Sequence, residues 1–304
     1  MVRFLGFLVG LGFVAAAAWS LLWGVVAYTT NPPEQTAEQR LHLEPRQPAG
    51  GYSFNGPLGR FDFQQVQRGF QVFKEVCSAC HSLSHVAFRD LRQIGYNEAE
   101  VRAIADQWQI QVPSINPDTG EAATRKAIPA DHFPSPYANE TAARQANNNA
   151  LPPDLSLMAK AREGGPAYIY SILTGFHNPP PGYQVPPNLH YNPYFANLNI
   201  AMPPPLTADG QVSYGPGNPR PTRDQMARDV SAFLMWTAEP NLQTRHWIGI
   251  PVLVFLIIAT VLAYLAYQNI WHGPTSRRVR ETGALDPENM AKNAESKREA
   301  GVAG

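Results

Sequence analysis

The feature that most constrains this chain is an uncharged apolar segment near its C-terminal end, Trp247 to Tyr267, which reads WIGIPVLVFLIIATVLAYLAY. At about 1.5 Å of rise per residue, a helix of this length crosses the hydrocarbon core of a bilayer. A buried core helix is the alternative, but soluble helices rarely lack a polar face over such a length. We therefore expect a transmembrane helix over residues 247–271, followed by a polar tail over residues 272–304.

Basic residues in this tail predict the orientation of the segment. Arg277, Arg278 and Arg280 follow it closely, and cytoplasmic loops carry an excess of Lys and Arg. The tail is therefore expected in the cytoplasm. The large domain that precedes the segment, residues 31–246, is expected on the other side of the membrane.

A second uncharged apolar run, Phe4 to Tyr28, follows Arg3 at the N-terminal end. A cleaved signal peptide would explain the basic start and the small residues Ala15 to Ala18. A retained anchor would explain why the run is longer than the apolar part of a signal peptide. Residues 1–30 are thus predicted to be either a signal peptide or a retained N-terminal transmembrane anchor, and both place the following domain outside.

Composition excludes some functions for the middle domain. The formal net charge of the chain is +0, and no basic block precedes the C-terminal tail, so nucleic-acid binding has no electrostatic footprint. The 29 prolines, many in pairs and triplets, favour long irregular loops between short helices. The two cysteines belong to one motif, which leaves none for a structural disulfide.

That motif is Cys77-Ser78-Ala79-Cys80-His81. Two thiols three positions apart on a helix lie on nearly one face and can add to the two vinyl groups of one haem. The histidine that follows can bind the iron, and C-x-x-C-H is the attachment signature of c-type haem. A thioredoxin-like redox pair, half a zinc site or chance are the alternatives, but βαβ alternation and a second cysteine pair are lacking. One covalent haem c at Cys77, Cys80 and His81 is therefore predicted.

Two segments have the spacing of amphipathic helices. The first leads into the motif and places its apolar residues at helical intervals, at Val66, Phe70, Phe73 and Cys77. The second begins after Thr222, a plausible N-cap, ends before Pro240 and has an apolar stripe at Met226, Val230, Phe233 and Trp236 or Thr237. Single-haem cytochromes pack an early helix against a late one near the haem, and these two segments are candidates for that pair.

The haem iron of many cytochromes is bound by one histidine and one methionine, so a second axial ligand is expected. The methionines after the motif and several histidines could supply it. The candidates are Met158, Met202, Met226 and Met235. Three of these lie on or beside helix-like stripes, where packing is the better explanation. Met202 lies in NIAMPPPL, whose prolines stiffen a non-helical loop, and position alone favours it.

Several strings together resemble the cytochrome c1 family, the haem subunits of ubiquinol–cytochrome c reductase (the cytochrome bc1 complex). The resemblance covers about Phe54 to Trp271. It rests on QRGFQVFKEVCSACHS at 67–82, DHFPSPYANETAARQANNNALPPDLS at 131–156, AREGGPAYIYSILTGF at 161–176, LHYNPYFANLNIAMPPPL at 189–206 and ARDVSAFLMWTAEP at 227–240. This combination is far more specific than C-x-x-C-H, which many unrelated cytochromes share.

The resemblance implies a mostly α fold, a cytochrome c-like haem domain with large loop insertions, together with the C-terminal transmembrane helix and the N-terminal apolar segment. It implies His81 and Met202 as the axial ligands. It also implies that Arg144 contacts a haem propionate, for which a guanidinium is suited by its fixed charge and forked donors; a solvated surface charge is the alternative. The chain departs from the family in lacking the extra cysteines of some members and in the length of its N-terminal apolar run.

The function that the resemblance implies is electron transfer. The haem would pass single electrons from a Rieske iron–sulfur protein to a soluble or tethered cytochrome c, beside cytochrome b and membrane lipid. The implied place is a bacterial inner membrane, with the haem domain in the periplasm. The chain would act as a redox subunit of the reductase with no bond-making catalytic residues of its own. A membrane-tethered monohaem carrier or an oxidase cytochrome subunit is the alternative, and a non-redox scaffold protein is a more distant one.

Overall fold

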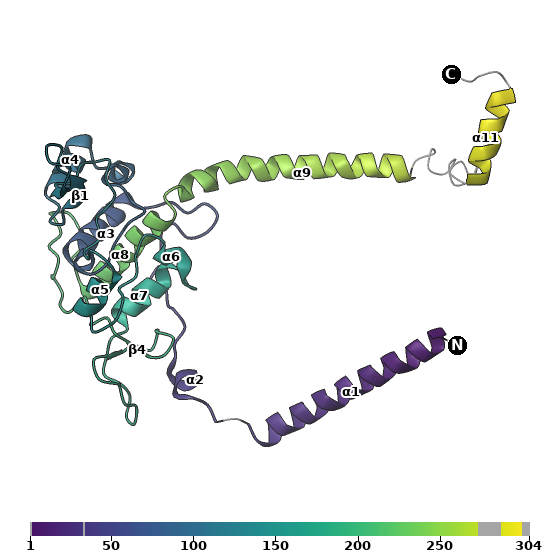
Figure 1. Cartoon of the computed structure of the whole chain (residues 1–304), viewed down its shortest axis with the longest axis horizontal. Helices are drawn as coiled ribbons and strands as arrows, with labels where there is room; N and C mark the ends of the chain where they lie inside the picture. The colour runs from purple at the N-terminus through teal and green to yellow at the C-terminus, as the bar shows by residue number, and fades with distance from the viewer. Residues whose placement is uncertain (1, 33, 273–286, 300–304) are drawn as a thin grey trace. The chain divides into compact units, whose positions relative to one another are not determined.

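Helices dominate the computed structural model of the chain, which describes residues 2–32, 34–272 and 287–299 (Figure 1). The α-helices are α1 (Val2–Thr30), α2 (Ala37–Leu41), α3 (Phe63–Glu75), α4 (Glu98–Asp106), α5 (Glu140–Ala146), α6 (Met158–Ala161), α7 (Pro166–Thr174), α8 (Arg223–Ala238), α9 (Leu242–His272) and α11 (Pro287–Glu299). Two 3-10 helices are η1 (Cys77–Ala79) and η2 (Phe88–Ile94). Long loops join these elements, and the expected mostly α fold is confirmed.

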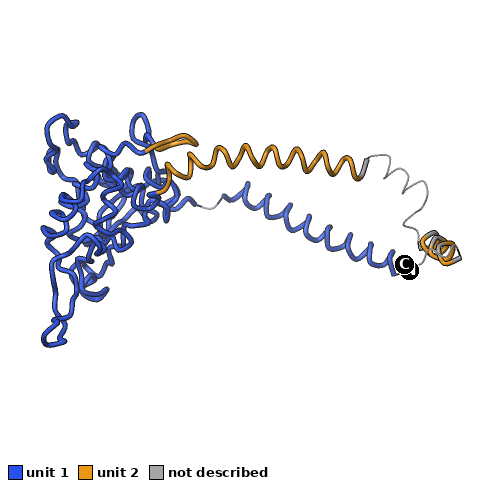
Figure 2. The backbone as a smooth tube through the Cα atoms, turned by 90° about the horizontal axis from the view of Figure 1, so that it is seen from above, with its two compact units in different colours: residues 1–53, 61–240 blue, residues 54–60, 241–304 orange. Residues whose placement is uncertain are grey.

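The chain divides into two compact units, coloured separately in Figure 2. Unit 1 comprises residues 1–53 and 61–240, and unit 2 comprises residues 54–60 and 241–304. All the residues predicted to hold the cofactor belong to unit 1, and the paragraphs on the site concern this unit alone.

Helix α3 forms where the sequence predicts it. The Asp62 side chain caps its N-terminus by accepting hydrogen bonds from the backbone N–H groups of Gln64 at 3.0 Å and Gln65 at 3.3 Å. The residues of its predicted apolar stripe, Val66, Phe70 and Phe73, are all buried. The helix therefore presents one apolar face to the core and leads directly toward the C-x-x-C-H motif.

Helix α8 is the predicted late helix. Its N-cap is Thr222, whose hydroxyl accepts a hydrogen bond from the Gln225 backbone N–H at 3.1 Å. It ends at Ala238, two residues before Pro240, as expected from a residue that cannot continue a helix. Met226, Val230 and Phe233 are completely buried, which confirms that Met226 serves packing.

Helices α3 and α8 cross at close range. A Cβ atom added at Gly69 would lie 2.0 Å from the Asp229 carbonyl oxygen, so the crossing requires glycine at this position. Phe233 packs with its ring centroid 5.6 Å from those of both Phe70 and Phe73. The Arg68 Nε donates to the fully buried Asp229 carboxylate at 2.9 Å, which pairs the charge at the crossing. The two helices are thus the expected early and late pair.

Aromatic side chains extend this core beyond α3 and α8. Phe133 packs tilted against Phe88 of η2 at a centroid distance of 4.2 Å and edge-on to Trp108 at 4.9 Å. Its ring also lies 6.1 Å from that of Phe70. An antiparallel bridge between Ala87 and His132 holds the two segments that carry these rings. The insertions after the motif therefore share the core of the helix pair.

Strands are few and short in the described part of the chain. Strand β1 (Val112–Ile115) pairs antiparallel with β2 (Ala122–Arg125), with Val112 opposite Arg125 and Ile115 opposite Ala122. Strand β3 (His190–Tyr191) pairs antiparallel with β4 (Asn199–Ile200), with His190 opposite Ile200. The second pair directly precedes the loop that carries Met202.

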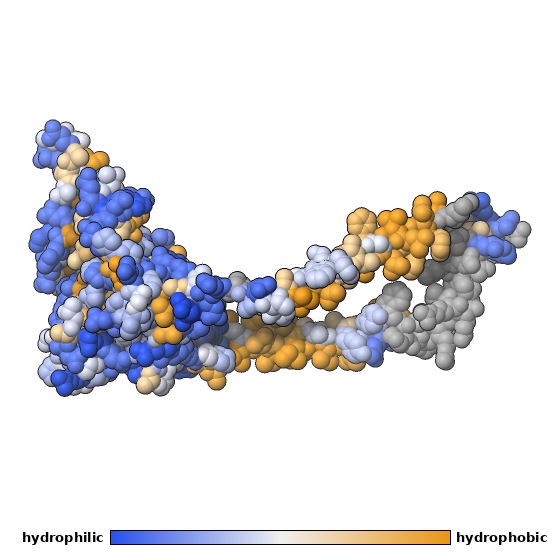
Figure 3. Space-filling model, turned by 90° about the horizontal axis from the view of Figure 1, so that it is seen from below, coloured by the Kyte–Doolittle hydropathy of each residue, from blue (hydrophilic) through white to orange (hydrophobic). Residues whose placement is uncertain are grey.

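Two long helices expose apolar side chains along their length (Figure 3). Helix α1 has 29 residues and α9 has 31, and both contain an apolar window that is long enough to span a membrane and is not buried. The two predicted apolar segments are confirmed as helices, and α9 begins at Leu242, five residues before Trp247. Arg277, Arg278 and Arg280, on which the predicted orientation depends, lie outside the described residues.

Candidate functional site

The C-x-x-C-H motif lies directly after α3, but not within it. The helix ends at Glu75, and Cys77–Ala79 form the 3-10 helix η1. The expectation that both thiols lie on an α-helix is therefore wrong. The backbone N–H groups of Cys80, at 3.1 Å, and His81, at 2.9 Å, both donate to the Cys77 carbonyl oxygen. Because a 3-10 helix has about three residues per turn, the two cysteines still share one side of the turn.

Both cysteines are free thiols. Cys77 is half-buried and Cys80 is exposed. Burial and, to a smaller extent, the neighbouring Cys80 raise the pKa of Cys77 to about 12, so this thiol stays neutral near pH 7. The pair offers two sulfur atoms on one turn, which fits two thioether bonds to a single haem.

His81 is held by a hydrogen bond to the backbone. Its Nδ1 lies 2.8 Å from the Pro153 carbonyl oxygen, and because a carbonyl can only accept, Nδ1 carries the proton. The Nε2 lone pair is then free to bind a metal. Burial lowers the pKa of His81, and the contact with Pro153 and the charge of Asp154 offset this only in part. The imidazole is thus neutral, as metal binding requires.

Met202 is half-buried and lies in an irregular segment two residues after β4. The loop is held on both sides of the methionine. Before it, the Asn192 backbone N–H donates to the Leu198 carbonyl oxygen at 2.8 Å. After it, the Gln211 Nε2 donates to the Pro205 carbonyl oxygen at 2.8 Å. A thioether can be held here without a helix behind it, and its pairing with His81 stays a prediction.

Arg144 lies in α5, and its side chain is exposed. Its Nη1 donates to the Asn149 carbonyl oxygen at 3.1 Å, and its own carbonyl accepts from the Asn149 N–H at 2.8 Å. Asn148 and Asn149 have φ angles of 50° and 65°, in the left-handed region that asparagine tolerates. The described contacts of Arg144 are therefore with its own loop, and a propionate contact stays a prediction.

The segment around α5 lies beside the C-x-x-C-H motif. The Asn147 Nδ2 donates to the Tyr137 hydroxyl oxygen at 2.9 Å, which lowers the pKa of Tyr137. Burial, a hydrogen bond with Cys80 and the charge of Cys80 outweigh this, so the net pKa of Tyr137 is raised. The contact with Cys80 places Tyr137 at the motif, a position that the spacing of the sequence did not indicate.

Asp154 is another residue that the sequence pattern did not single out. Its carboxylate accepts from the Ser82 hydroxyl and from the backbone N–H groups of Ser84 and Ser156, each at 2.8 Å. Burial raises the pKa of Asp154, but hydrogen bonds from these three serines outweigh it and hold the pKa well below its usual range. The sequence near Asp154 gives only a local indication, because an aspartate that follows two prolines favours a turn.

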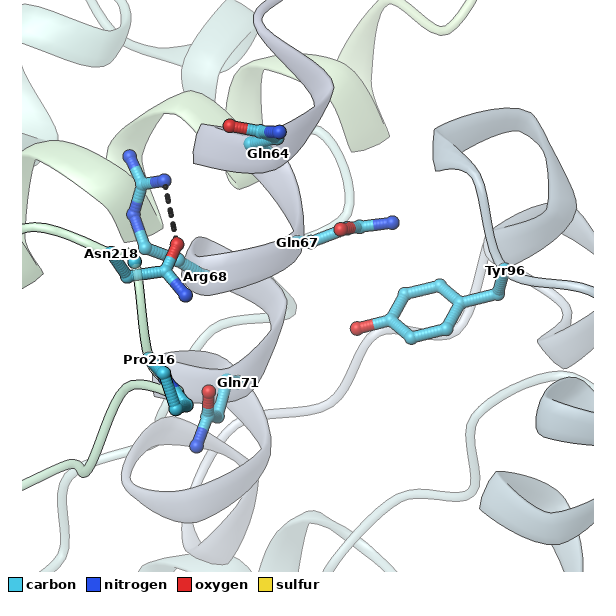
Figure 4. Close-up of a pocket in the computed structure, with 8 residues that line it drawn as sticks. Gln64, Gln67, Arg68, Gln71, Tyr96, Pro216 and Asn218 are labelled. Carbon is cyan, nitrogen blue, oxygen red and sulfur yellow. Dashed lines mark hydrogen bonds between the residues drawn. The ribbon is translucent and has the colours of Figure 1, made fainter.

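Two surface hollows lie elsewhere in unit 1. One, of about 440 Å³, borders α3 and the loop at residues 216–218 (Figure 4) and is lined by Gln64, Gln67, Arg68, Gln71, Tyr96, Pro216, Gly217 and Asn218. Arg68 there donates to the Asn218 side chain at 3.3 Å. The other, of about 830 Å³, reaches the loop that carries Met202 at Pro204 and Leu206. None of the predicted cofactor-binding residues lines either hollow.

The donor set fits a covalent haem better than a metal ion held by the protein alone. Within residues 2–32, 34–272 and 287–299, no group of three or more His, Cys, Asp or Glu side chains could hold a metal ion. Cys77 and Cys80 offer free thiols on one turn, and His81 offers a free Nε2. Two thiols followed by a neutral imidazole are the groups that attachment to two vinyl groups and to iron requires.

Comparisons with known proteins agree with this chemistry. A profile of the Cytochrome C1 family matches residues 52–273. "Cytochrome c1" of Rhodospirillum rubrum is 44% identical over 236 residues, which are 72% of this chain and 85% of that protein. "Cytochrome c1, heme protein, mitochondrial" of Saccharomyces cerevisiae is 43% identical over 268 residues, 87% of this chain and 84% of that protein.

A longer relative matches over part of its length. "Cytochrome b/c1" of Bradyrhizobium diazoefficiens is 44% identical over 246 residues, which are 74% of this chain but 35% of that protein.

The helical unit, the C-x-x-C-H turn and the two exposed apolar helices define the class, which is that of membrane-anchored cytochromes. Within this class, the chain belongs to the Cytochrome C1 family.

Proposed function

We propose that this chain is the haem-bearing electron-transfer subunit of a quinol–cytochrome c oxidoreductase. It takes single electrons from a Rieske iron–sulfur protein and passes them to a soluble or tethered cytochrome c, and it is bound to cytochrome b in the membrane. The observation that carries the proposal is the C-x-x-C-H turn, with His81 held at the Pro153 carbonyl, in a chain of the Cytochrome C1 family.

One haem c is the proposed cofactor. Cys77 and Cys80 would hold it through thioether bonds, and His81 and Met202 would be its axial ligands. Bound haem iron supplies a couple that accepts and releases one electron. The Pro153 carbonyl keeps the His81 proton on Nδ1, and the hydrogen bond from the Gln211 side chain to the Pro205 carbonyl fixes the loop that follows Met202. The chain thus contributes ligands and their orientation, and we propose that no side chain of this subunit makes or breaks a substrate bond.

We also propose a bacterial inner-membrane location, with the domain at residues 31–246 in the periplasm and the tail at residues 272–304 in the cytoplasm. Support comes from the exposed apolar helix α9 and from the basic residues that follow it. Helix α1 is long and apolar enough for a retained anchor, and a signal sequence has the same apolar character. Sequencing the N-terminus of the mature protein decides between cleavage and retention of residues 1–30.

Arg144→Ala tests the proposed propionate contact. A cation near the haem favours the reduced, less positive form, so its loss should lower the midpoint potential. The side chain is exposed and its field is screened by salt, so we expect a shift smaller than the roughly 59 mV that corresponds to a tenfold change in a one-electron equilibrium. A redox titration of the purified variant measures it.

Arg220→Ala is the matched control, because it removes the same charge from another exposed position of unit 1. We expect its midpoint potential to equal that of the wild type. If Arg144→Ala and Arg220→Ala both leave the potential and the melting temperature unchanged, Arg144 is a solvated surface charge that makes no propionate contact.

The proposed function is tested by purification of the chain from its native membrane. Cytochrome b and a Rieske protein should co-purify, and the preparation should reduce cytochrome c with quinol in an antimycin-sensitive manner. A membrane-tethered monohaem carrier would instead be purified without these subunits and without this activity. That result would contradict the proposal and favour the alternative.

A further inference from the structure

A network of hydrogen bonds joins the segment after His81 to the segment after Pro153. The Asp154 carboxylate lies at its centre. One carboxylate oxygen, Oδ2, accepts from the Ser82 hydroxyl and the Ser84 backbone N–H, and the other, Oδ1, accepts from the Ser156 backbone N–H. We refer to Asp154 with these three serines as the Asp154 clamp.

Backbone contacts reinforce the clamp. The Leu155 N–H donates to the Ser82 carbonyl oxygen at 2.9 Å, and the His85 N–H donates to the Ser156 hydroxyl at 3.1 Å. Ser156 is fully buried, and its carbonyl accepts from the Thr237 hydroxyl of α8 at 3.1 Å. The clamp is therefore fixed to the core helix as well as to the motif.

This arrangement determines the position of the Pro153 carbonyl. Asp154 directly follows Pro153, and Ser82 directly follows His81. A carboxylate that bridges residues 82 and 84 to residue 156 leaves little freedom to the carbonyl one residue away. The hydrogen bond between His81 Nδ1 and the Pro153 carbonyl is thus constrained at both ends. Each of its two residues is adjacent in the chain to a residue of the Asp154 clamp.

We propose that Asp154 is a positioning residue for the axial histidine. Its carboxylate fixes the Pro153 carbonyl against His81 Nδ1 and so sets the orientation and donor strength of the imidazole toward the iron. This inference rests on the proposed function, because it assigns Asp154 a role only if His81 binds haem iron.

The direction of the effect follows from the chemistry of the ligand. A firm Nδ1–H···O=C hydrogen bond makes the imidazole a stronger donor, and a stronger donor favours ferric iron. Loosening the clamp weakens this bond, so the midpoint potential should rise. Groups that orient a metal ligand typically contribute about tenfold or more to metal affinity or activity. We expect a change of the same size in the one-electron equilibrium of the haem, which corresponds to about 59 mV.

The test compares three variants of the full-length protein in its native membrane complex. Asp154→Asn keeps the shape of the side chain but places an amide group where the carboxylate accepts from N–H donors. Ser82→Ala removes one donor and leaves the charge of Asp154 in place. Asp131→Asn is the matched control, because Asp131 also accepts three hydrogen bonds, from both Nη atoms of Arg125 and from the Ile128 N–H.

Two readouts are needed, the midpoint potential and the electron paramagnetic resonance spectrum of the oxidised haem. Removal of a negative charge alone raises the potential but leaves the axial ligands unchanged, whereas a reoriented imidazole also moves the g values. We expect Asp154→Asn to raise the midpoint potential by about 59 mV, which corresponds to a tenfold change in the one-electron equilibrium, and to shift the g values. Ser82→Ala should change both in the same direction to a smaller extent, and Asp131→Asn should leave the g values unchanged.

Unaltered g values in both Asp154→Asn and Ser82→Ala would overturn the inference, even if the potential moves. If Asp154→Asn does not accumulate, Ser82→Ala decides by the same criterion.

The wild-type protein is first stained for covalent haem after denaturing electrophoresis. A negative stain would overturn the proposed function itself, whereas a positive stain with unaltered variants would overturn only the role of Asp154.

Discussion

Met202→Leu should lower the midpoint potential of the haem by at least about 100 mV while the haem stays covalently attached. The thioether is a soft ligand that favours ferrous iron, and leucine keeps the volume but supplies no ligand. Electron transfer from a Rieske centre would then become unfavourable, and quinol-dependent reduction of cytochrome c should collapse in a complex that still assembles. A redox titration measures the shift.

Met158→Leu is the control for this experiment. Met158 is the first residue of α6, is half-buried and was a weaker ligand candidate, so its replacement should leave the potential close to that of the wild type. The weak sulfur-to-iron charge-transfer absorption of the oxidised protein should vanish in Met202→Leu and persist in Met158→Leu. If the absorption and the potential both survive in Met202→Leu, Met202 is not the ligand, and Met158 or a histidine must be considered.

Replacing both Cys77 and Cys80 with alanine should abolish covalent haem. The two free thiols lie on one turn, and both proposed thioether bonds are lost together. We expect no haem signal from this variant after denaturing electrophoresis, against a full signal from Met202→Leu, in which both thiols remain. A haem stain that persists in the double variant would show that attachment does not occur at these cysteines.

Local patterns predicted the helices well. The stripe that contains Val66, Phe70 and Phe73 identified α3, and the cap at Thr222 together with Pro240 bounded α8. These predictions succeeded because helix ends and apolar faces are encoded within a few residues. The two long apolar helices were equally clear, since soluble helices rarely stay uncharged and apolar on every face over such a length.

Contacts between distant segments could not be predicted in this way. Asp154 and Ser82 are 72 positions apart, and neither periodicity nor spacing relates them. The same holds for the Nδ1 contact of His81 with Pro153. The 3-10 turn at Cys77 was missed for another reason: the helical stripe of α3 includes Cys77, although the helix ends at Glu75, and helix ends are the least certain part of a periodicity argument.

The observed partner of the Arg144 side chain is another contact that the sequence could not predict. The resemblance implies a propionate contact, and the structure gives its guanidinium a carbonyl partner within its own loop, at Asn149. The same loop contacts Tyr137 through the Asn147 side chain. Spacing alone could not have identified the partner, because it depends on two asparagines in left-handed conformations.

The central claim is that this chain carries one covalent haem c, and the most direct test is a pyridine haemochrome spectrum of the purified protein after extraction with acidified acetone. This extraction removes haem that is not covalently bound. We expect the spectrum of a haem with both vinyl groups converted to thioethers, at one haem per chain. Complete loss of the haem on extraction, or the spectrum of a haem with intact vinyl groups, would contradict the claim.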